Sequence, residues 1–199
     1  MIKNASRFKA AIAAIDAANA EDPNMCCHEG RDVPKTLLYG IRMTERLGFF
    51  RPEASESLRL AARSQHIRRW EIPRSDYPMD RVGYLKWRTA LKHFHAGIAK
   101  TLLEAAGYDA ATIAHVQSLL RKEKLKQDTE AQALEDVICL VFLEHDFADF
   151  SKKHAEEKIL GILRKTWKKM SPDAQKAALQ LDLFPTARAQ IEKALQAPG

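Results

Sequence analysis

Apolar residues recur three and four positions apart along almost the whole chain, which is the pattern of helices packed on a common core. One face of residues 6–20 is apolar in this way and predicts a first helix. A loop over residues 22–33 follows, and a second helix is expected from Pro34 to about Gly48. The sequence contains no series of alternating β-branched runs bounded by turns. The pattern therefore predicts an all-α fold.

Prolines, glycines and capping residues mark the boundaries of the next helices. A third helix is expected to begin around Pro52 and to end before Pro73, because the residue before a proline disfavours the helical state. Residues 71–80 hold two prolines and are predicted to be a loop. The residues expected to cap the helices that follow them are Asp80, Asp109 and Asp128. The long helix after Asp80 is expected to stop at Gly107.

The most apolar part of the chain lies near its C-terminal third. Residues 134–143 are apolar around most of the helix circumference, which predicts a central, buried helix. Further helices are expected over residues 155–169, 172–180 and 186–196, supported by Ser171-Pro172 and Pro185.

Composition places the chain among ordinary globular proteins. It has 199 residues, of which 46% are apolar and 29% charged, with 8 Gly and 8 Pro, and this excludes collagen, low-complexity disorder and a disulfide miniprotein. The length suits a single helical domain over residues 1–199. The three cysteines, Cys26, Cys27 and Cys139, form no disulfide framework, so a cytoplasmic location is expected. No run reaches the roughly 18 apolar residues of a membrane span, so no membrane partner is expected.

The positive charge of the chain is concentrated in one stretch. Residues 59–92 contain nine Lys and Arg against three Asp and Glu, a difference of +6 that equals the net charge of the whole protein. Trp70, Tyr77, Tyr84 and Trp87 are interleaved with this charge. Arginines with aromatic side chains supply the forked donors and flat faces that a phosphate or a base requires. A solvated basic face, with the tryptophans in the core, explains the same pattern, and both interpretations remain open.

Two acids, Glu135 and Asp136, precede the most apolar run, and Gln132 lies one turn before Asp136. A carboxylate beside a buried apolar segment needs a partner, because an unpaired buried charge is costly. A salt bridge to an arginine of residues 59–92 is one interpretation, and metal ligation or general-base catalysis is the other. The histidines that a metal would add are His66 and His95.

Several blocks of the sequence resemble a known family over nearly the whole chain. The blocks are LLYGIRMTERL, LRLAARSQHIRRWEIPRSDYP, RVGYLKWRTALKHFHA, LEDVICLVFLEHDF and ILRKTWKKMSP. They resemble the domain-of-unknown-function family numbered 4202, found in bacteria and plants. The resemblance implies a single all-helical domain.

A more distant similarity is to the HD-domain phosphohydrolases, helical proteins in which histidines and aspartates from separate helices hold divalent metals. Gln65-His66 stands where that superfamily has His-Asp, and Asp136 stands at its final aspartate. The resemblance implies His66, His95 and Asp136 as metal ligands and His66, Glu135 and Asp136 as catalytic residues. The sequence departs from the pattern because residues 34–46 contain no histidine and Arg121-Lys122 occupies a place where many members carry histidines.

Two functional hypotheses follow. In the first, the protein is a divergent phosphohydrolase that uses a divalent metal to activate water against a nucleotide-like phosphorylated substrate. In the second, the metal site is degenerate and the protein is a non-catalytic module that binds an anion, either a nucleotide or RNA. In the first hypothesis Arg63, Arg69, Arg74 and Arg81 clamp the phosphate. The full set of side chains expected to bind the substrate is Arg63, Arg69, Arg74, Arg81, Arg88 and Lys122.

Overall fold

The structure is a computed structural model that describes residues 2, 4–125 and 127–196. Nearly all of its regular structure is helical, so the predicted all-α fold is confirmed, with one small hairpin in addition. The chain divides into two compact units, Met1–Ala131 and Gln132–Gly199, and the division falls inside a helix. The single domain expected over residues 1–199 stays a prediction.

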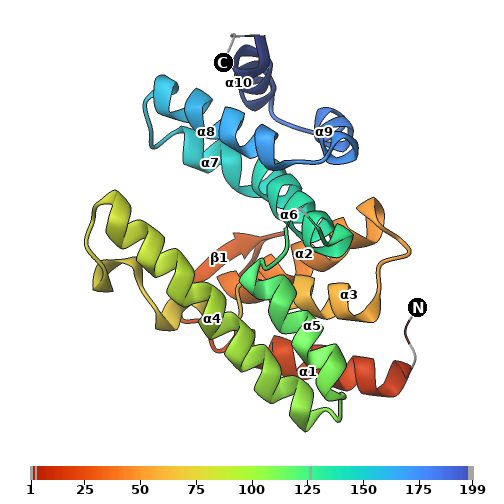
Figure 1. The fold of residues 1–199 in the computed structure, drawn as a ribbon. Coiled ribbons are helices and arrows are strands. Elements are labelled where there is room, and N and C mark those ends of the chain that lie inside the picture. The colour runs from red at the N-terminus through yellow and green to blue at the C-terminus, as the bar shows by residue number, and fades with distance from the viewer. Residues whose placement is uncertain (1, 3, 126, 197–199) are drawn as a thin grey trace. The chain divides into compact units, whose positions relative to one another are not determined.

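The first unit, which runs from red to green in Figure 1, is built around the long helix α4 and its neighbour α5. Helix α5 packs against α4 on one side and α3 on the other, while α2 packs against α3 and α1 contacts α2, α3 and α4. Two short 3₁₀ turns, η1 and η2, lie between α3 and α4. The elements are α1 (Ala5–Ala20), β1 (Met25–His28), β2 (Arg31–Pro34), α2 (Lys35–Phe50), α3 (Glu56–Arg63), η1 (Arg69–Glu71), η2 (Arg74–Asp76), α4 (Arg81–Ala105) and α5 (Ala110–Arg121).

The second unit contains the remaining helices. Helix α10 packs against α8 and also contacts α7. The elements are α6 (Thr129–Val141), which begins just before the division, the π-helical turn η3 (Phe142–Asp146), α7 (Phe147–Ser151), α8 (Glu156–Lys169), α9 (Pro172–Leu179) and α10 (Pro185–Gln196). The apolar run predicted to be buried lies in α6 and η3, where Leu134, Val137 and Leu140 are buried, so that prediction is confirmed.

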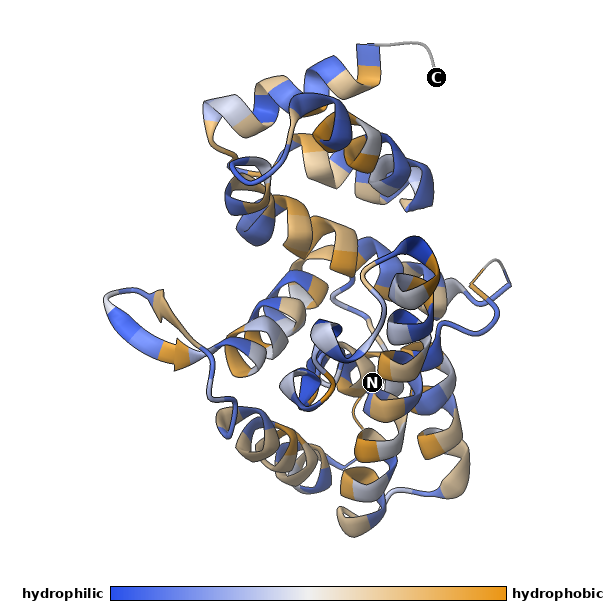
Figure 2. Ribbon diagram, turned by 90° about the vertical axis from the view of Figure 1, so that its left-hand side faces the viewer, coloured by the Kyte–Doolittle hydropathy of each residue, from blue (hydrophilic) through white to orange (hydrophobic). Residues whose placement is uncertain are grey.

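The hairpin corrects the expectation of an irregular loop over residues 22–33. Strands β1 and β2 pair antiparallel from Met25 opposite Pro34 to His28 opposite Arg31, and Figure 2 shows the hairpin projecting beside the helices. Glu29 and Gly30, the two turn residues, have φ angles of 51° and 76°. Positive φ at both central positions gives the twist that joins two short strands.

Local capping chemistry sets the starts of α4, α5 and α6 as predicted. Asp80, Asp109 and Asp128 each accept a hydrogen bond from a backbone N–H in the first turn that follows, at 2.7, 2.8 and 2.8 Å. Gly107, with φ of 79°, ends α4 where predicted. The third helix begins at Glu56 rather than near Pro52, because the hydroxyl oxygen of Ser55 accepts from the Leu58 N–H and caps it there. None of the described helices combines the length and apolar composition of a membrane span.

Candidate functional site

A small basic cavity in the first unit gathers side chains from four separate segments. They come from the turn after α3, from η1, from α4 and from the C-cap of α5. The residues lining this basic cavity are Gln65, His66, Arg69, Arg88, Leu91, Lys92, His95 and Lys122. Its volume is about 20 Å³. Five of the side chains predicted to form a site are therefore brought together, and no carboxylate is among the lining residues.

Two residues in the segments that form this cavity, Arg68 and Lys122, have the left-handed backbone conformation. Arg68 has φ of 50° and turns the backbone between α3 and η1, and its N–H donates to the Asn19 side-chain oxygen at 3.2 Å. The side chain of Arg68 pairs with Glu21 and Glu71 outside the cavity. Lys122 has φ of 59° and ends α5. Non-glycine residues seldom adopt this conformation, so the surrounding contacts must hold these turns in place.

The buried polar residues that line the cavity are Gln65 and His95, and we call these two its floor. His95 is the more buried of the two. It is 3% exposed, and its Nδ1 lies 2.8 Å from the Ile67 carbonyl oxygen. Since a carbonyl oxygen only accepts, Nδ1 carries the proton and Nε2 of the neutral ring is an acceptor. Burial lowers the pKa of His95 to about 4, against the opposing effect of the bond to Ile67 and with the help of Arg69 and Arg88. The ring is therefore neutral at pH 7.

Two of the residues that line the cavity carry a buried acceptor atom. Nε2 of His95 and Oε1 of Gln65 are both buried and make no hydrogen bond with the described residues. Both side chains line the cavity. A buried polar atom without a partner costs free energy comparable to a lost hydrogen bond, so a hydrogen-bond donor that reaches either atom would be stabilised there.

The walls of the cavity are its cationic lining residues, Arg69, Arg88, Lys92 and Lys122, and the Arg69 guanidinium packs on an aromatic ring. The guanidinium carbon of Arg69 lies 4.6 Å from the centre of the Trp87 ring, and the indole N–H of Trp87 donates to the Ile72 carbonyl at 2.9 Å. Burial, with the charge of Arg88, lowers the pKa of Arg69 to about 10, so its guanidinium stays charged at pH 7. No ion pair or hydrogen bond of Arg88 occurs within the described residues.

His66 completes the cavity as a half-buried side chain. Its ring stacks on Tyr39 with the ring centres 3.9 Å apart and the planes 17° from parallel. Burial lowers the pKa of His66 well below its ordinary value, and the charges of Arg69, Arg88 and Lys122 and the nearby His95 lower it further. The stacking fixes the ring, and its neighbours favour the neutral form.

Three predicted phosphate-binding arginines lie outside the cavity. Arg63 donates to both carboxylate oxygens of Asp16, at 2.6 and 2.7 Å. Arg74 donates to the carbonyl oxygens of the loop before α4, so its guanidinium closes that loop. Arg81 is exposed at the start of α4. Arg63 and Arg74 therefore have structural partners.

Asp136 and Glu135 lie on α6 in the second unit, each with a partner. The carboxylate of Asp136 accepts from the Ser171 N–H and hydroxyl at 2.8 and 2.6 Å, and from the Gln132 amide at 2.9 Å. Glu135 lies 3.7 Å from the ammonium of Lys169. The expectation that these acids need partners is confirmed, and the hydrogen bonds of Asp136 go to Ser171 and Gln132. Their catalytic and metal-binding roles stay predictions.

Residues 9–191 match the model of the family described as Domain of unknown function (DUF4202). The chain belongs to the DUF4202 family. Neither the curated proteins nor the solved structures gave a match. The similarity to the HD-domain phosphohydrolases receives no support from these comparisons.

The basic cavity of this DUF4202 protein does not fit a metal ion. Within the described residues, no three His, Cys, Asp or Glu side chains gather into a group that could hold one. His66 and His95 are accompanied instead by two arginines and two lysines. A cation there would be repelled by fixed positive charge, whereas an anion would be attracted.

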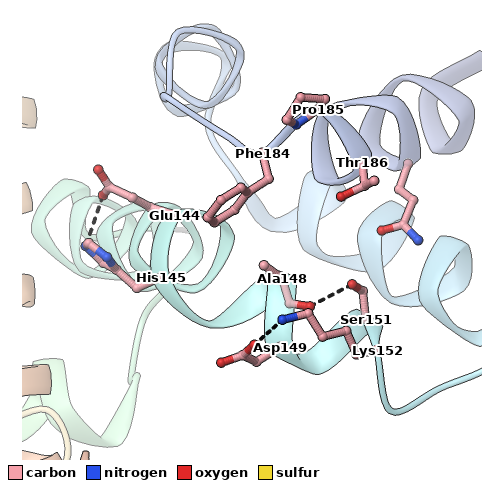
Figure 3. A pocket seen from close by; sticks show the side chains of 10 residues that line it. Glu144, His145, Ala148, Asp149, Ser151, Lys152, Phe184, Pro185 and Thr186 are labelled. Atoms are coloured by element: carbon pink, nitrogen blue, oxygen red, sulfur yellow. Dashed lines mark hydrogen bonds and ion pairs between the residues drawn. The ribbon is translucent and has the colours of Figure 1, made fainter. Parts of the chain in front are cut away.

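A larger cavity of about 830 Å³ lies in the second unit of this DUF4202 protein, beside η3, α7 and the start of α10 (Figure 3). Phe184 points from the start of α10 toward the helix that carries Glu144. The charged groups that line it are paired: Glu144 with His145 at 3.3 Å, and Asp149 with Lys152 at 2.8 Å. None of the predicted site residues lines this cavity, and its charges need no ligand.

Proposed function

We propose that this protein binds the terminal phosphate of a phosphorylated small molecule, such as a nucleotide, in the basic cavity and without a metal ion. One observation carries the proposal. Arg69 and Arg88 approach the neutral, buried His95 in a cavity whose lining includes no carboxylate. Converging cations without an anion are costly unless a ligand supplies the negative charge.

Electrostatics supports an anion over a neutral ligand. At an effective dielectric constant of about 20, opposite unit charges about 4 Å apart attract by about 4 kcal/mol before desolvation is counted. Arg69 and Arg88 already disfavour each other's charge, as the lowered pKa of Arg69 indicates. A phosphate between them replaces this repulsion with two attractions, and guanidinium groups match phosphate oxygens in a forked geometry.

The size of the cavity limits what enters it. A volume of about 20 Å³ accommodates roughly one water-sized group. One phosphate oxygen therefore reaches the floor, and the rest of the phosphate lies at the mouth among the cationic side chains. This arrangement favours the end of a molecule over an internal segment of a chain. Metal-dependent hydrolysis through His66, Glu135 and Asp136 finds no comparable support.

The experiment is a calorimetric titration with a nucleoside monophosphate at low salt. Arg88→Gln is expected to weaken binding by about tenfold or more, because it removes a charge at the cavity. The matched control is Arg81→Gln, which removes the same charge from an exposed position on the same helix and should change affinity by about twofold or less.

Three outcomes would contradict the proposal. One is the absence of binding to any nucleotide or inorganic phosphate. Another is an equal loss in Arg81→Gln and Arg88→Gln, which would mean that diffuse surface charge attracts the ligand. The third concerns RNA: short single-stranded RNA that binds equally with and without a terminal phosphate would indicate backbone binding on the basic surface.

A further inference from the structure

The floor of the basic cavity offers acceptors, although its walls offer cations. His95 presents Nε2 as a lone pair because its Nδ1 proton is used by the Ile67 carbonyl at 2.8 Å. Oε1 of Gln65 is a second acceptor, and neither atom has a partner among the described residues. Both residues are more than nine-tenths buried.

A fully deprotonated oxyanion is attracted by the cationic walls of such a cavity, but it cannot donate a hydrogen bond to the acceptors of its floor. Its oxygens are acceptors only, so an oxygen against Nε2 of His95 and Oε1 of Gln65 places lone pairs against lone pairs. A protonated oxygen on the same ligand donates to one of these atoms while its charged oxygens face Arg69, Arg88, Lys92 and Lys122. Only the second arrangement satisfies both parts of the cavity.

We infer that the basic cavity selects an oxyanion that carries a proton on one oxygen, which is the monoanion of a phosphomonoester, and discriminates against sulfate esters and phosphodiesters. The inference rests on the proposed function and narrows its ligand class. A phosphodiester, such as an internal RNA linkage, has no P–OH group at neutral pH and leaves the floor unsatisfied. A phosphomonoester has a second pKa of about 6, so its monoanion is well populated in mildly acidic solution.

Two changes on binding would turn the floor of the basic cavity from an acceptor into a donor. If His95 took up a proton on binding, or if the Gln65 amide turned its NH₂ toward the cavity, the floor would become a donor. Sulfate and phosphate esters would then bind alike. The burial of His95 and its cationic neighbours oppose that proton uptake.

The test compares methyl phosphate with methyl sulfate at about pH 5, followed by amide chemical shifts of the intact protein. Both ligands then carry about one negative charge and have nearly the same shape, so they differ mainly in the proton. Methyl phosphate is expected to bind at least about tenfold more tightly, because only it supplies the donor that the buried acceptors lack. Equal affinity, or tighter binding of methyl sulfate, overturns the inference while leaving the proposed anion site intact.

A variant at Gln65 removes an acceptor of the floor without changing the charge of the cavity. Gln65→Met keeps the size of the side chain but removes Oε1, so the preference for methyl phosphate should fall while methyl sulfate binds no more weakly than before. An unchanged preference in a variant with an unchanged thermal midpoint assigns the selectivity to His95 alone, and His95→Leu, which carries no acceptor, then has to abolish it. If neither variant changes the preference, the inference is wrong. Failure of both esters and of inorganic phosphate to bind contradicts the proposed function itself.

Discussion

The Nδ1–H of His95 donates to the carbonyl oxygen of Ile67, 2.8 Å away and 28 residues earlier in the chain. This bond links α4 to the turn that follows α3, and it fixes the tautomer of the ring. The atom left over, Nε2, is buried beside two arginines. The same hydrogen bond therefore stabilises the first unit and determines that Nε2 of His95 is an acceptor.

The first prediction concerns acid stability. His95 has its pKa lowered from 6.5 to about 4 in the folded protein, so the unfolded chain binds more protons between these values. The neutral ring therefore contributes stability that is fully present above about pH 6.5 and is lost as the pH falls toward about 4, on the order of 3 kcal/mol in all. His66, whose pKa is also lowered, acts in the same direction.

Urea unfolding at several pH values measures this effect. His95→Gln should flatten the decline between about pH 6.5 and 4, because glutamine does not titrate. The control is His93→Gln, which removes an exposed histidine two residues away on the same helix and keeps His95, so the decline should persist. A decline of the same size in His95→Gln would show that other groups cause it.

The second prediction separates fold from binding at Arg63. The guanidinium of Arg63 donates to the two carboxylate oxygens of Asp16 at 2.6 and 2.7 Å, and the Arg63 side chain is 11% exposed. Arg63→Gln should therefore lower the free energy of unfolding by about 1 to 2 kcal/mol. Phosphate affinity should change by about twofold or less, because the lost charge lies outside the cavity lining. Lys100→Gln, which breaks an exposed pair with Glu104, should cost about 0.5 kcal/mol or less. An Arg63 variant that folds normally but loses phosphate binding would restore its predicted role in the site.

Helix boundaries were largely predictable because their causes are local. Asp80, Asp109 and Asp128 each act within three residues of their own position, so the sequence alone indicates the cap. The hairpin was not predictable in the same way. Its turn depends on positive φ at Glu29, and glutamate is not among the residues that typically favour that conformation.

For the basic cavity, the sequence indicated a basic stretch of chain but not which of its side chains line the cavity. The excess of charge within residues 59–92 includes Arg69 and Arg88, which line the cavity, but the sequence does not distinguish them from Arg63, which does not. That distinction depends on Asp16, which lies 47 residues from Arg63. The unpaired acceptor of Gln65 likewise has no sequence signal, because pairing is a property of the packed structure.

The third prediction concerns divalent metals. Because the cavity around His66 and His95 is lined by cations, adding Mg²⁺, Mn²⁺ or Zn²⁺ should leave the thermal midpoint unchanged, whereas inorganic phosphate should raise it. The measurement is the thermal midpoint after dialysis against a chelator, with each ion added separately. Stoichiometric metal that survives dialysis, and that His66→Gln and Asp136→Asn both remove, would favour the phosphohydrolase hypothesis instead.

The last prediction concerns Asp136, for which the two functional hypotheses give opposite outcomes. The carboxylate accepts from the N–H and hydroxyl of Ser171, and the Ser171 oxygen in turn accepts from the Ala174 N–H at 3.2 Å and caps α9. Asp136→Asn leaves one acceptor oxygen in place of two and should lower the free energy of unfolding by about 1 to 3 kcal/mol. Phosphate binding in the first unit should be unchanged or stronger, because a negative charge is removed.

The control for this change is Asp182→Asn, an exposed carboxylate, which should alter the free energy of unfolding by about 0.5 kcal/mol or less. Under the phosphohydrolase hypothesis, Asp136→Asn instead abolishes metal-stimulated phosphate release while the thermal midpoint stays normal. Both quantities have to be measured on the same preparation, because a destabilised variant loses activity for reasons unrelated to catalysis. A stable Asp136→Asn protein that loses such an activity would assign Asp136 to a catalytic site, whereas a destabilised one that binds phosphate normally supports the structural role seen at Ser171.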